Sequence, residues 1–184
     1  MDRTAETLFD AIDDGDIDAT LEHLKHARGL LELRDEGGMT PLLRAAVGLT
    51  RDPALIAALL DAGADPRATT DDGETALHLL VDVEGDSGFG DEPLLLLRPV
   101  VDAGCPLEAR SADGLTALGL AVVHGTPDEV LAFVRLGADV HVRLPEPFEP
   151  EDLSGASLLA AALGSPEKVE ALVAAGADPD HRSA

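Results

Sequence analysis

The sequence predicts an all-α fold built from about five copies of one helix-turn-helix unit. First, the segment Gly-Ala-Asp-Pro occurs at residues 63–66 and 176–179, with relatives at 104–107 and 137–140. Second, a Gly-x-Thr-x-Leu signal or a close variant precedes each of them, at residues 38–42, 73–77, 114–118 and 155–159. Third, apolar residues after each second signal are spaced as on one face of a helix. Such self-similarity is the mark of a repeat architecture.

Residues with known terminal preferences mark the helix ends. Threonine precedes the first helix of three units, where its hydroxyl can accept from orphan backbone amides; these residues are Thr40, Thr75 and Thr116. Pro41 occupies a first helical position, where no donor is lost. Glycine follows each second helix, where positive φ is favoured; these residues are Gly63, Gly104, Gly137 and Gly176. One such pair cannot bury its apolar face alone, whereas a stack of pairs can.

The order of these motifs resembles the ankyrin-repeat family. Residues 40–45 match Thr-Pro-Leu-His-x-Ala except at the histidine, and residues 75–78 keep the histidine but lose the proline. Residues 116–121 lose both, and residues 157–162 are the weakest copy. The resemblance covers nearly the whole chain. It implies an α-solenoid of stacked helix pairs with short β-hairpin fingers, and it fixes no chemistry.

The motifs divide the chain into one domain, residues 1–184, of five repeats. The first is an N-terminal cap with a helix around residues 7–12, a turn at 13–16 and a second helix at 18–27. Its polar residues suit a cap that faces water. We predict the repeats at residues 4–33, 34–68, 69–109, 110–142 and 143–184, the last being the C-terminal cap.

Three irregularities interrupt the repeat pattern. Residues 84–93 are inserted between the two helices of the third repeat, and residues 143–152 lengthen the finger of the fifth. Their Gly, Pro and acidic content predicts irregular segments, and insertions in repeat proteins often lie on binding faces. Pro99 falls inside an expected helix, where proline removes a hydrogen bond. We expect that helix to be kinked or to start late.

Composition and charge exclude some partners. The net charge is −23, with 36 acidic and 13 basic residues. Nucleic-acid binders need a basic surface, and anionic membranes attract basic segments, so neither partner is expected. An acidic protein is soluble and can capture a basic partner quickly. The charge could equally serve solubility alone.

The cysteine count, the N-terminal residues and the amino-acid composition indicate the cellular context. A single cysteine, Cys105, excludes an internal disulfide and is expected to be a small buried residue. The first residues have no basic and apolar signal-peptide pattern, and no apolar stretch approaches a membrane span. We therefore expect a cytoplasmic protein. The chain has no Trp or Tyr, and its composition suggests a high-GC, bacterial genome.

Two of the four phenylalanines are candidates for binding a partner. Phe9 and Phe133 lie on expected helices and are expected in the core. Phe89 and Phe148 lie in the inserted acidic segments, where an aromatic with a charged rim resembles an interface anchor. Alternatively, each folds back and seals the groove between neighbouring repeats.

The finger tips form the second candidate surface. The family resemblance implies a concave surface made by the fingers and the ends of the first helices. On this chain it comprises Glu36, Met39, Asp71, Asp72, Glu74, Asp82, Asp113, Leu115 and His124, together with Val47. The alternative is that finger-tip carboxylates only accept from turn amides. We expect that role for Asp35, and a binding role for the acidic group of the third repeat.

Catalytic and metal chemistry find little support in the sequence. The acidic stretch at residues 13–18 lacks the ligand order of a calcium-binding EF-hand. His23 and His26 lie three apart, but no third zinc ligand is nearby in sequence. Phosphate-binding glycine loops are absent, and no nucleophile, base and orienting group occur together. We predict no catalytic residues, no metal and no cofactor.

The predicted function is therefore protein–protein binding by a monomer. A basic partner would be steered by the negative potential and would dock into a groove of repeats two to four. The protein would act as an adaptor or regulator. Alternatives are a stoichiometric inhibitor, such as an immunity protein that neutralises a basic toxin or enzyme, and a nucleic-acid mimic.

Overall fold

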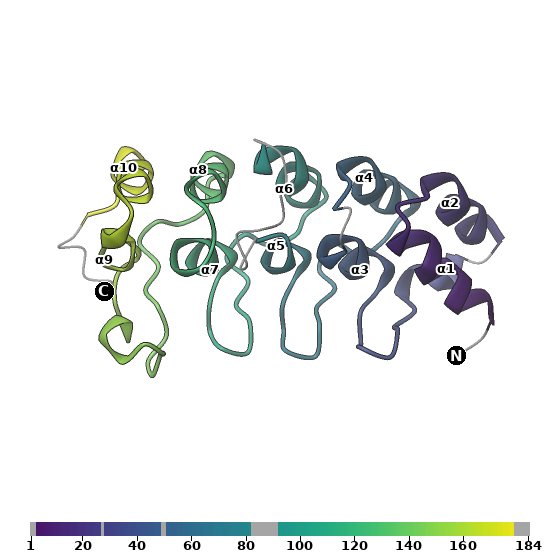
Figure 1. Ribbon diagram of the computed structural model, residues 1–184, viewed down its shortest axis with the longest axis horizontal. Coiled ribbons are helices and arrows are strands. Elements are labelled where there is room, and N and C mark those ends of the chain that lie inside the picture. The colour runs from purple at the N-terminus through teal and green to yellow at the C-terminus, as the bar shows by residue number, and fades with distance from the viewer. Residues whose placement is uncertain (1–2, 27, 49–50, 82–91, 179–184) are drawn as a thin grey trace. The chain divides into compact units, whose positions relative to one another are not determined.

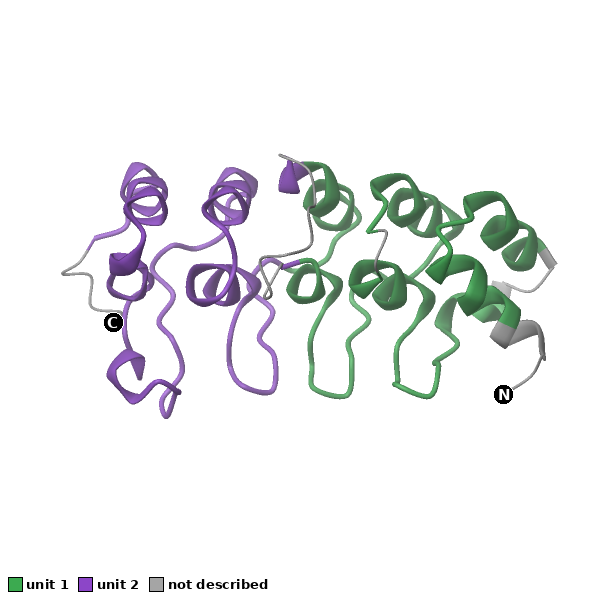
Figure 2. Cartoon of the chain, in the orientation of Figure 1, with its two compact units in different colours: residues 1–80, 95–106 green, residues 81–94, 107–184 purple. Residues whose placement is uncertain are grey.

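A computed structural model describes residues 3–26, 28–48, 51–81 and 92–178 (Figure 1). The chain divides into two compact units (Figure 2). Unit 1 comprises residues 1–80 and 95–106, and unit 2 comprises residues 81–94 and 107–184. The assignment of residues 1–184 to one domain stays a prediction.

Unit 1 consists of helix pairs in sequence order. Its helices are α1 (Arg3–Asp13), α2 (Ile17–His26), α3 (Pro41–Val47), α4 (Pro53–Ala62), α5 (Ala76–Leu79) and most of α6 (Pro93–Asp102), with the 3-10 helix η1 (Arg28–Glu32). The first helices α1, α3 and α5 pack side by side, and α2 packs on α4 (Figure 1). Helix pairing in sequence order, which the repeated motifs predict, is confirmed.

Unit 2 repeats the arrangement with a shorter final pair. Its helices are α7 (Ala117–Val123), α8 (Pro127–Leu136), α9 (Leu158–Ala161) and α10 (Pro166–Ala174), with 3-10 helices η2 (Glu151–Leu153) and η3 (Ala162–Gly164). α9 packs on α7 and α10 packs on α8. The all-α class predicted from the sequence is confirmed for the described residues.

The predicted terminal residues are found at the helix ends. Thr40 Oγ1 accepts from the Leu43 amide at 3.4 Å, and Thr116 Oγ1 accepts from the Gly119 amide at 3.1 Å. Gly63 and Gly137 have φ of 104° and 92° and follow α4 and α8, so a side chain there would be strained. Short-range chemistry therefore sets where each helix begins and ends.

The cores of both units are aliphatic, and among the described residues two phenylalanine rings are buried in them. Phe9 is 6% exposed and Phe133 is fully buried, which confirms their expected core positions. Cys105 is 3% exposed, and burial raises the pKa of its thiol above the ordinary value. It is therefore the small buried residue that the sequence predicts, and its thiolate form is disfavoured.

The fingers are short hairpins closed by isolated bridges. Antiparallel bridges pair Thr69 with Thr75, Arg110 with Thr116, and Arg143 with Ser157. Residues 144–150 are neither helical nor bridged before η2 begins, which confirms the prediction for this extended finger. The other predicted irregular segment, residues 84–92, lies almost entirely outside the described residues.

Pro99 does not delay its helix. α6 begins at Pro93 and continues through Pro99 to Asp102, so the predicted late start is wrong. The proline removes only the hydrogen bond to the Leu95 carbonyl. Leu95 is 57% exposed, so this residue is accessible to water, which can lower the cost of the lost bond.

No helix in the described part of the chain combines the length and apolar character that a bilayer span requires.

Candidate protein-interaction surface

An arginine ties two neighbouring fingers of unit 1 together. Arg34 Nη1 donates to the Gly38 carbonyl of its own finger and, at 2.9 Å, to the Thr69 carbonyl of the next. A Cβ added to Gly38 would lie only 3.1 Å from Asp71 Oδ2, so the two tips approach closely. The fingers of repeats two and three therefore present their tips as neighbours.

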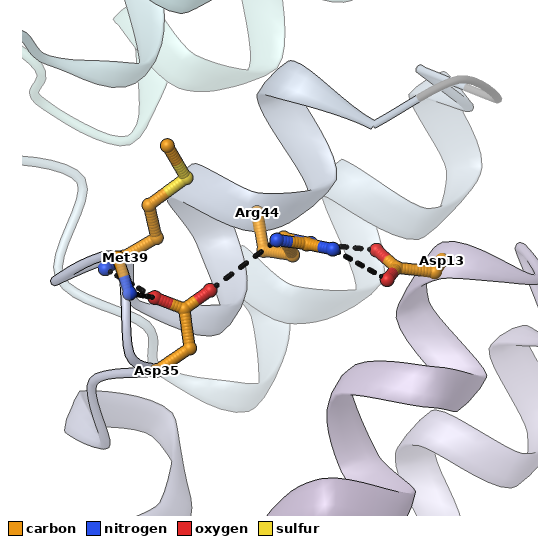
Figure 3. A network of polar contacts seen from close by, with 5 residues as sticks. Asp13, Asp35, Met39 and Arg44 are labelled. Carbon is orange, nitrogen blue, oxygen red and sulfur yellow. Dashed lines mark hydrogen bonds and ion pairs between the residues drawn. The ribbon is translucent and has the colours of Figure 1, made fainter.

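Asp35 has the structural role that its position predicts. Its Oδ1 accepts from the amides of Gly37 and Met39 at 2.8 and 2.9 Å, and its Oδ2 lies 3.4 Å from Arg44 Nη1 (Figure 3). Arg44 donates to both carboxylate oxygens of Asp13 at 2.6 and 2.7 Å. This contact with Asp13 is the main reason why the pKa of Arg44 is raised. The network joins α1, α3 and the second finger.

Exposed carboxylates surround these tips. Glu36, Asp71 and Asp72 are exposed, while Met39 and Glu74 are half-buried. The Glu74 amide donates to Thr70 Oγ1 at 3.2 Å, which holds the backbone of the third finger. Unit 1 therefore brings together five of the predicted site residues. We call Glu36, Asp71 and Asp72 the finger carboxylates.

Unit 2 carries three further predicted site residues. Asp113 is exposed at the tip of the fourth finger, and His124 is exposed at the end of α7. Leu115 is only 7% exposed, and its Cδ2 atom lies 3.4 Å from where a Cβ of Gly119 would be. Little of the Leu115 side chain is left for a partner. The predicted groove from repeat two to repeat four stays a prediction.

Of the remaining predicted site residues Asp82, Phe89 and Phe148, the structure describes only Phe148. Phe148 is half-buried in the irregular part of the fifth finger. Part of the ring therefore remains accessible to a partner. Asp82 and Phe89 lie outside the described residues, and their proposed roles stay predictions.

Three arginines, which were not predicted as site residues, donate to the backbone of the fingers. Arg110 Nη1 donates to the Gly114 carbonyl at 2.5 Å, and Arg143 Nη1 donates to the Gly155 carbonyl at 2.7 Å. Arg34 does the same for Gly38. Their spacing could have identified two of these arginines from the sequence, because Arg34 and Arg110 each stand six positions before the capping threonine. These cations are held by finger carbonyls, while the tip carboxylates face water.

A buried lysine was also overlooked. Lys168 on α10 is 8% exposed, and its Nζ donates to the carbonyls of Ala121 and Val122 at 3.1 and 2.8 Å. Burial lowers the pKa of Lys168, and the nearby Glu129 raises it in part. The amine therefore donates to two carbonyls in the last turn of α7.

The described residues offer no assembled metal centre. Within residues 3–26, 28–48, 51–81 and 92–178, no three His, Cys, Asp or Glu side chains gather closely enough to hold an ion. The absence of a metal or cofactor from the whole protein stays a prediction.

Comparison with known proteins gives several relatives, although no family model matches the chain. The chain is 36% identical over 101 residues to B-cell lymphoma 3 protein homolog of Mus musculus, covering 55% of this chain and 21% of that protein. It is 33% identical over 129 residues to NF-kappa-B inhibitor alpha of Sus scrofa, covering 68% and 40%. It is 32% identical over 108 residues to Protein PhlB of Serratia liquefaciens, covering 58% and 44%. The chain thus spans less than half the length of each.

Three lines of evidence converge on one family. The capping threonines and terminal glycines recur in order, the helices pair in that order, and each finger precedes its helix pair. The B-cell lymphoma 3 and NF-kappa-B inhibitor relatives are ankyrin-repeat proteins. The chain belongs to the ankyrin-repeat family.

Proposed function

We propose that this protein is a binding protein, not an enzyme, and that it regulates a partner protein with a basic surface. The observation that carries the proposal is the exposed group of finger carboxylates on adjoining tips of unit 1. The exposed Arg34 at the base of these fingers offsets only one of the three carboxylate charges. The tips therefore favour a cationic partner surface.

The relatives support the protein-binding class. Several of them are named as inhibitors of NF-kappa-B, which is a regulatory role exercised on another protein. In the first form of the proposal, this protein is an adaptor or regulator. It acts in the cytoplasm and is a monomer before it binds its partner. The partner's identity is open to experiment.

A stoichiometric inhibitor is the second form. The inhibitor names among the relatives favour it, and an acidic protein suits neutralisation of a basic toxin or enzyme. A captured basic enzyme whose activity falls in proportion to added protein would support this form. An unaffected activity would leave the adaptor. A nucleic-acid mimic would instead be displaced from its partner by DNA.

The main experiment removes the finger charges. In one variant Glu36→Gln, Asp71→Asn and Asp72→Asn are combined. A matched control, Asp10→Asn with Asp61→Asn and Asp102→Asn, changes the same charge at exposed helical sites. Each protein is used as bait in an extract of its source, and association rates with the captured partner are measured across ionic strengths.

We expect the finger variant to associate more slowly and with a weaker salt dependence, because steering can raise association rates ~10–10³-fold. The control should retain most of the wild-type rate. Equal association rates for the finger variant and wild type at every ionic strength would refute the proposed surface.

A second variant, Phe148→Ala, decides the role of the half-buried ring. We propose that Phe148 anchors the partner, so the variant should lose about 2 kcal/mol or more of binding and almost no stability. A sealing residue would instead lower the free energy of unfolding, by up to roughly 3–5 kcal/mol for a fully buried ring. Calorimetric binding and urea unfolding of the same variant separate these roles; lost stability with intact affinity would contradict the anchor.

A further inference from the structure

The second and third fingers of unit 1 are each closed by their own hydrogen bonds. In the second finger, the Asp35 amide donates to the Met39 carbonyl at 3.0 Å. Asp35 Oδ1 also accepts from the Met39 amide at 2.9 Å (Figure 3). In the third, the Thr70 amide donates to the Glu74 carbonyl at 2.9 Å, and Thr70 Oγ1 accepts from the Glu74 amide at 3.2 Å. Each finger is therefore a closed loop with a defined tip.

Arg34 joins these two loops through one nitrogen atom. Its Nη1 donates to the Gly38 carbonyl of the second finger and, at 2.9 Å, to the Thr69 carbonyl of the third. Thr69 is itself bridged to Thr75, which immediately precedes α5. A single guanidinium group therefore holds the backbone of the second finger against the base of the third.

The finger carboxylates lie close to this junction. A Cβ added to Gly38 would be 3.1 Å from Asp71 Oδ2, and Glu36 stands only two positions before Gly38. Asp72 directly follows Asp71. Within the described residues, no ion pair holds any of these three carboxylates. Their relative positions are therefore set by the backbones of the two fingers that carry them.

The fourth finger, in unit 2, provides a comparison. Arg110 also stands six positions before a capping threonine, and its Nη1 donates to the Gly114 carbonyl of its own finger. In the part of the chain that the structure describes, Arg110 has no hydrogen bond to another finger. Arg34→Met and Arg110→Met would remove the same charge and the same bond within a finger. Only Arg34→Met would also remove a bond between fingers.

Electrostatic complementarity alone does not explain an arginine in this place. Arg34 is exposed, and its charge would repel the cations of the basic partner proposed above. The bond between the fingers has the opposite effect on binding. Carboxylates that are already spaced to meet the cations of a partner lose less conformational entropy when they bind it.

We propose that Arg34 is a positioning residue, which fixes the spacing of the finger carboxylates and so selects partners whose cations have a matching spacing. Arg34 acts through the carbonyls of Gly38 and Thr69 and does not need to touch the partner. This inference rests on the proposed function, because it specifies how the same surface discriminates among basic partners.

The test uses a series of synthetic ruler peptides as probes. Each has a pair of arginines at both ends, separated by a run of prolines that is lengthened two residues at a time. Polyproline is stiff and rises about 3.1 Å per residue, so each step moves the arginine pairs about 6 Å further apart. Fluorescence anisotropy at low ionic strength measures binding to wild type, Arg34→Met, Arg34→Lys and Arg110→Met. Urea unfolding checks that each variant is folded.

We expect wild type and Arg110→Met to bind one ruler about threefold or more tightly than the shortest and longest rulers, because held tips match one spacing. Arg34→Met should bind all the rulers with nearly equal affinity, although its net charge equals that of Arg110→Met. Arg34→Lys should restore part of the preference, since one nitrogen makes both contacts and an ammonium also has several donors.

Three outcomes would overturn the inference: a preference that survives in Arg34→Met, an equal loss of preference in Arg110→Met, or no preference in wild type. The variant Glu36→Gln, Asp71→Asn, Asp72→Asn tests the proposed function separately. If it binds every ruler as strongly as wild type, the finger carboxylates are not the cation site and the proposed function fails. If it loses affinity for every ruler while wild type shows no preference, the surface stands and the role of Arg34 is rejected.

Discussion

At the scale of single residues, the two lysines of the chain have opposite environments. Lys25 is exposed and pairs with Glu22 at 2.6 Å. Lys168 is buried and donates to the last carbonyls of α7. The first contact is worth little because water screens it, whereas the second satisfies buried acceptors and carries a desolvation cost. Burial dominates, so the pKa of Lys168 is lowered from 10.5.

This lowered pKa predicts a pH-dependent stability difference between wild type and Lys168→Met. Between the lowered folded pKa and 10.5, the unfolded chain binds more protons at Lys168 than the folded chain does. The free energy of unfolding of wild type should therefore rise, relative to the variant, as pH increases from about 7 to about 10. Urea unfolding of both proteins at each pH measures this difference.

Lys25→Met is the control for that experiment. Because Lys25 is exposed on α2, the difference in unfolding free energy between Lys25→Met and wild type should stay constant across the same pH range. A constant difference between wild type and Lys168→Met across the range would contradict the prediction.

At the scale of elements, a side chain at the start of one finger forms a hydrogen bond with the backbone of a neighbouring repeat. Glu32 Oε1 accepts from the Asp65 amide at 3.2 Å, and Glu108 Oε1 accepts from the Asp139 amide at 2.8 Å. At the corresponding junction between repeats two and three, the amide position is Pro106, which has no N–H to donate. That junction has Arg67 in place of glutamate.

Arg67 reverses the direction of the contact. Its Nε donates to the Gly104 carbonyl at 3.4 Å, within unit 1. The glutamate-to-arginine change therefore matches the loss of the donor at Pro106. We infer that the two positions are energetically coupled.

A double-mutant cycle tests this coupling. Arg67→Glu alone should destabilise the protein slightly, because the new carboxylate has no amide to accept from. Arg67→Glu with Pro106→Asp restores the Glu32–Asp65 pattern, so the double variant should be more stable than the sum of single effects predicts, by about 0.5–1 kcal/mol. Strict additivity in urea unfolding would reject the coupling. Arg98→Glu with Pro106→Asp serves as the charge-matched control, since Arg98 is an exposed residue of α6.

At the scale of the whole molecule, the charge opposes folding. The chain has 36 acidic and 13 basic residues, and several of its arginines are held by finger carbonyls. Like-charge repulsion in the folded state exceeds that in the expanded chain. Salt screens this repulsion over distances of about 10 Å at ~0.1 M.

Thermal stability should therefore increase with sodium chloride concentration. The expected result is a Tm that rises most steeply up to ~0.15 M salt, where the Debye length shortens to about 8 Å. Scanning calorimetry measures it. The Glu36→Gln, Asp71→Asn, Asp72→Asn variant carries less negative charge and should show a smaller rise, and a Tm that falls with salt would contradict the argument.

Much of the fold could be predicted because its signals are local. Thr40 and Thr116 cap helices, and Gly63 and Gly137 end them, through interactions within a few residues. The predicted late start at Pro99 was wrong, because the cost of the lost hydrogen bond depends on the surroundings of Leu95, which are a tertiary property. Asp35 was assigned correctly to turn amides because that contact spans only four residues.

The candidate surface was only partly predictable. Spacing placed Glu36, Asp71 and Asp72 at finger tips, where the structure finds them exposed. It could not reveal that Leu115 is 7% exposed, or that Leu163 is 75% exposed, because exposure depends on which neighbour covers a helix. Val122, six positions after Thr116, is only 2% exposed, whereas Leu163, six positions after Ser157, is 75% exposed.

By itself, the sequence determined the repeat unit, the helix class and the order of the pairs, since caps, terminal glycines and apolar spacing act over short distances. The tertiary structure decided which side chains remain available to a partner. It buried Lys168 against the end of α7, brought Asp71 against Gly38, and left Leu163 uncovered. Each of these depends on contacts between segments more than thirty positions apart, or on their absence, and no local motif encodes such contacts.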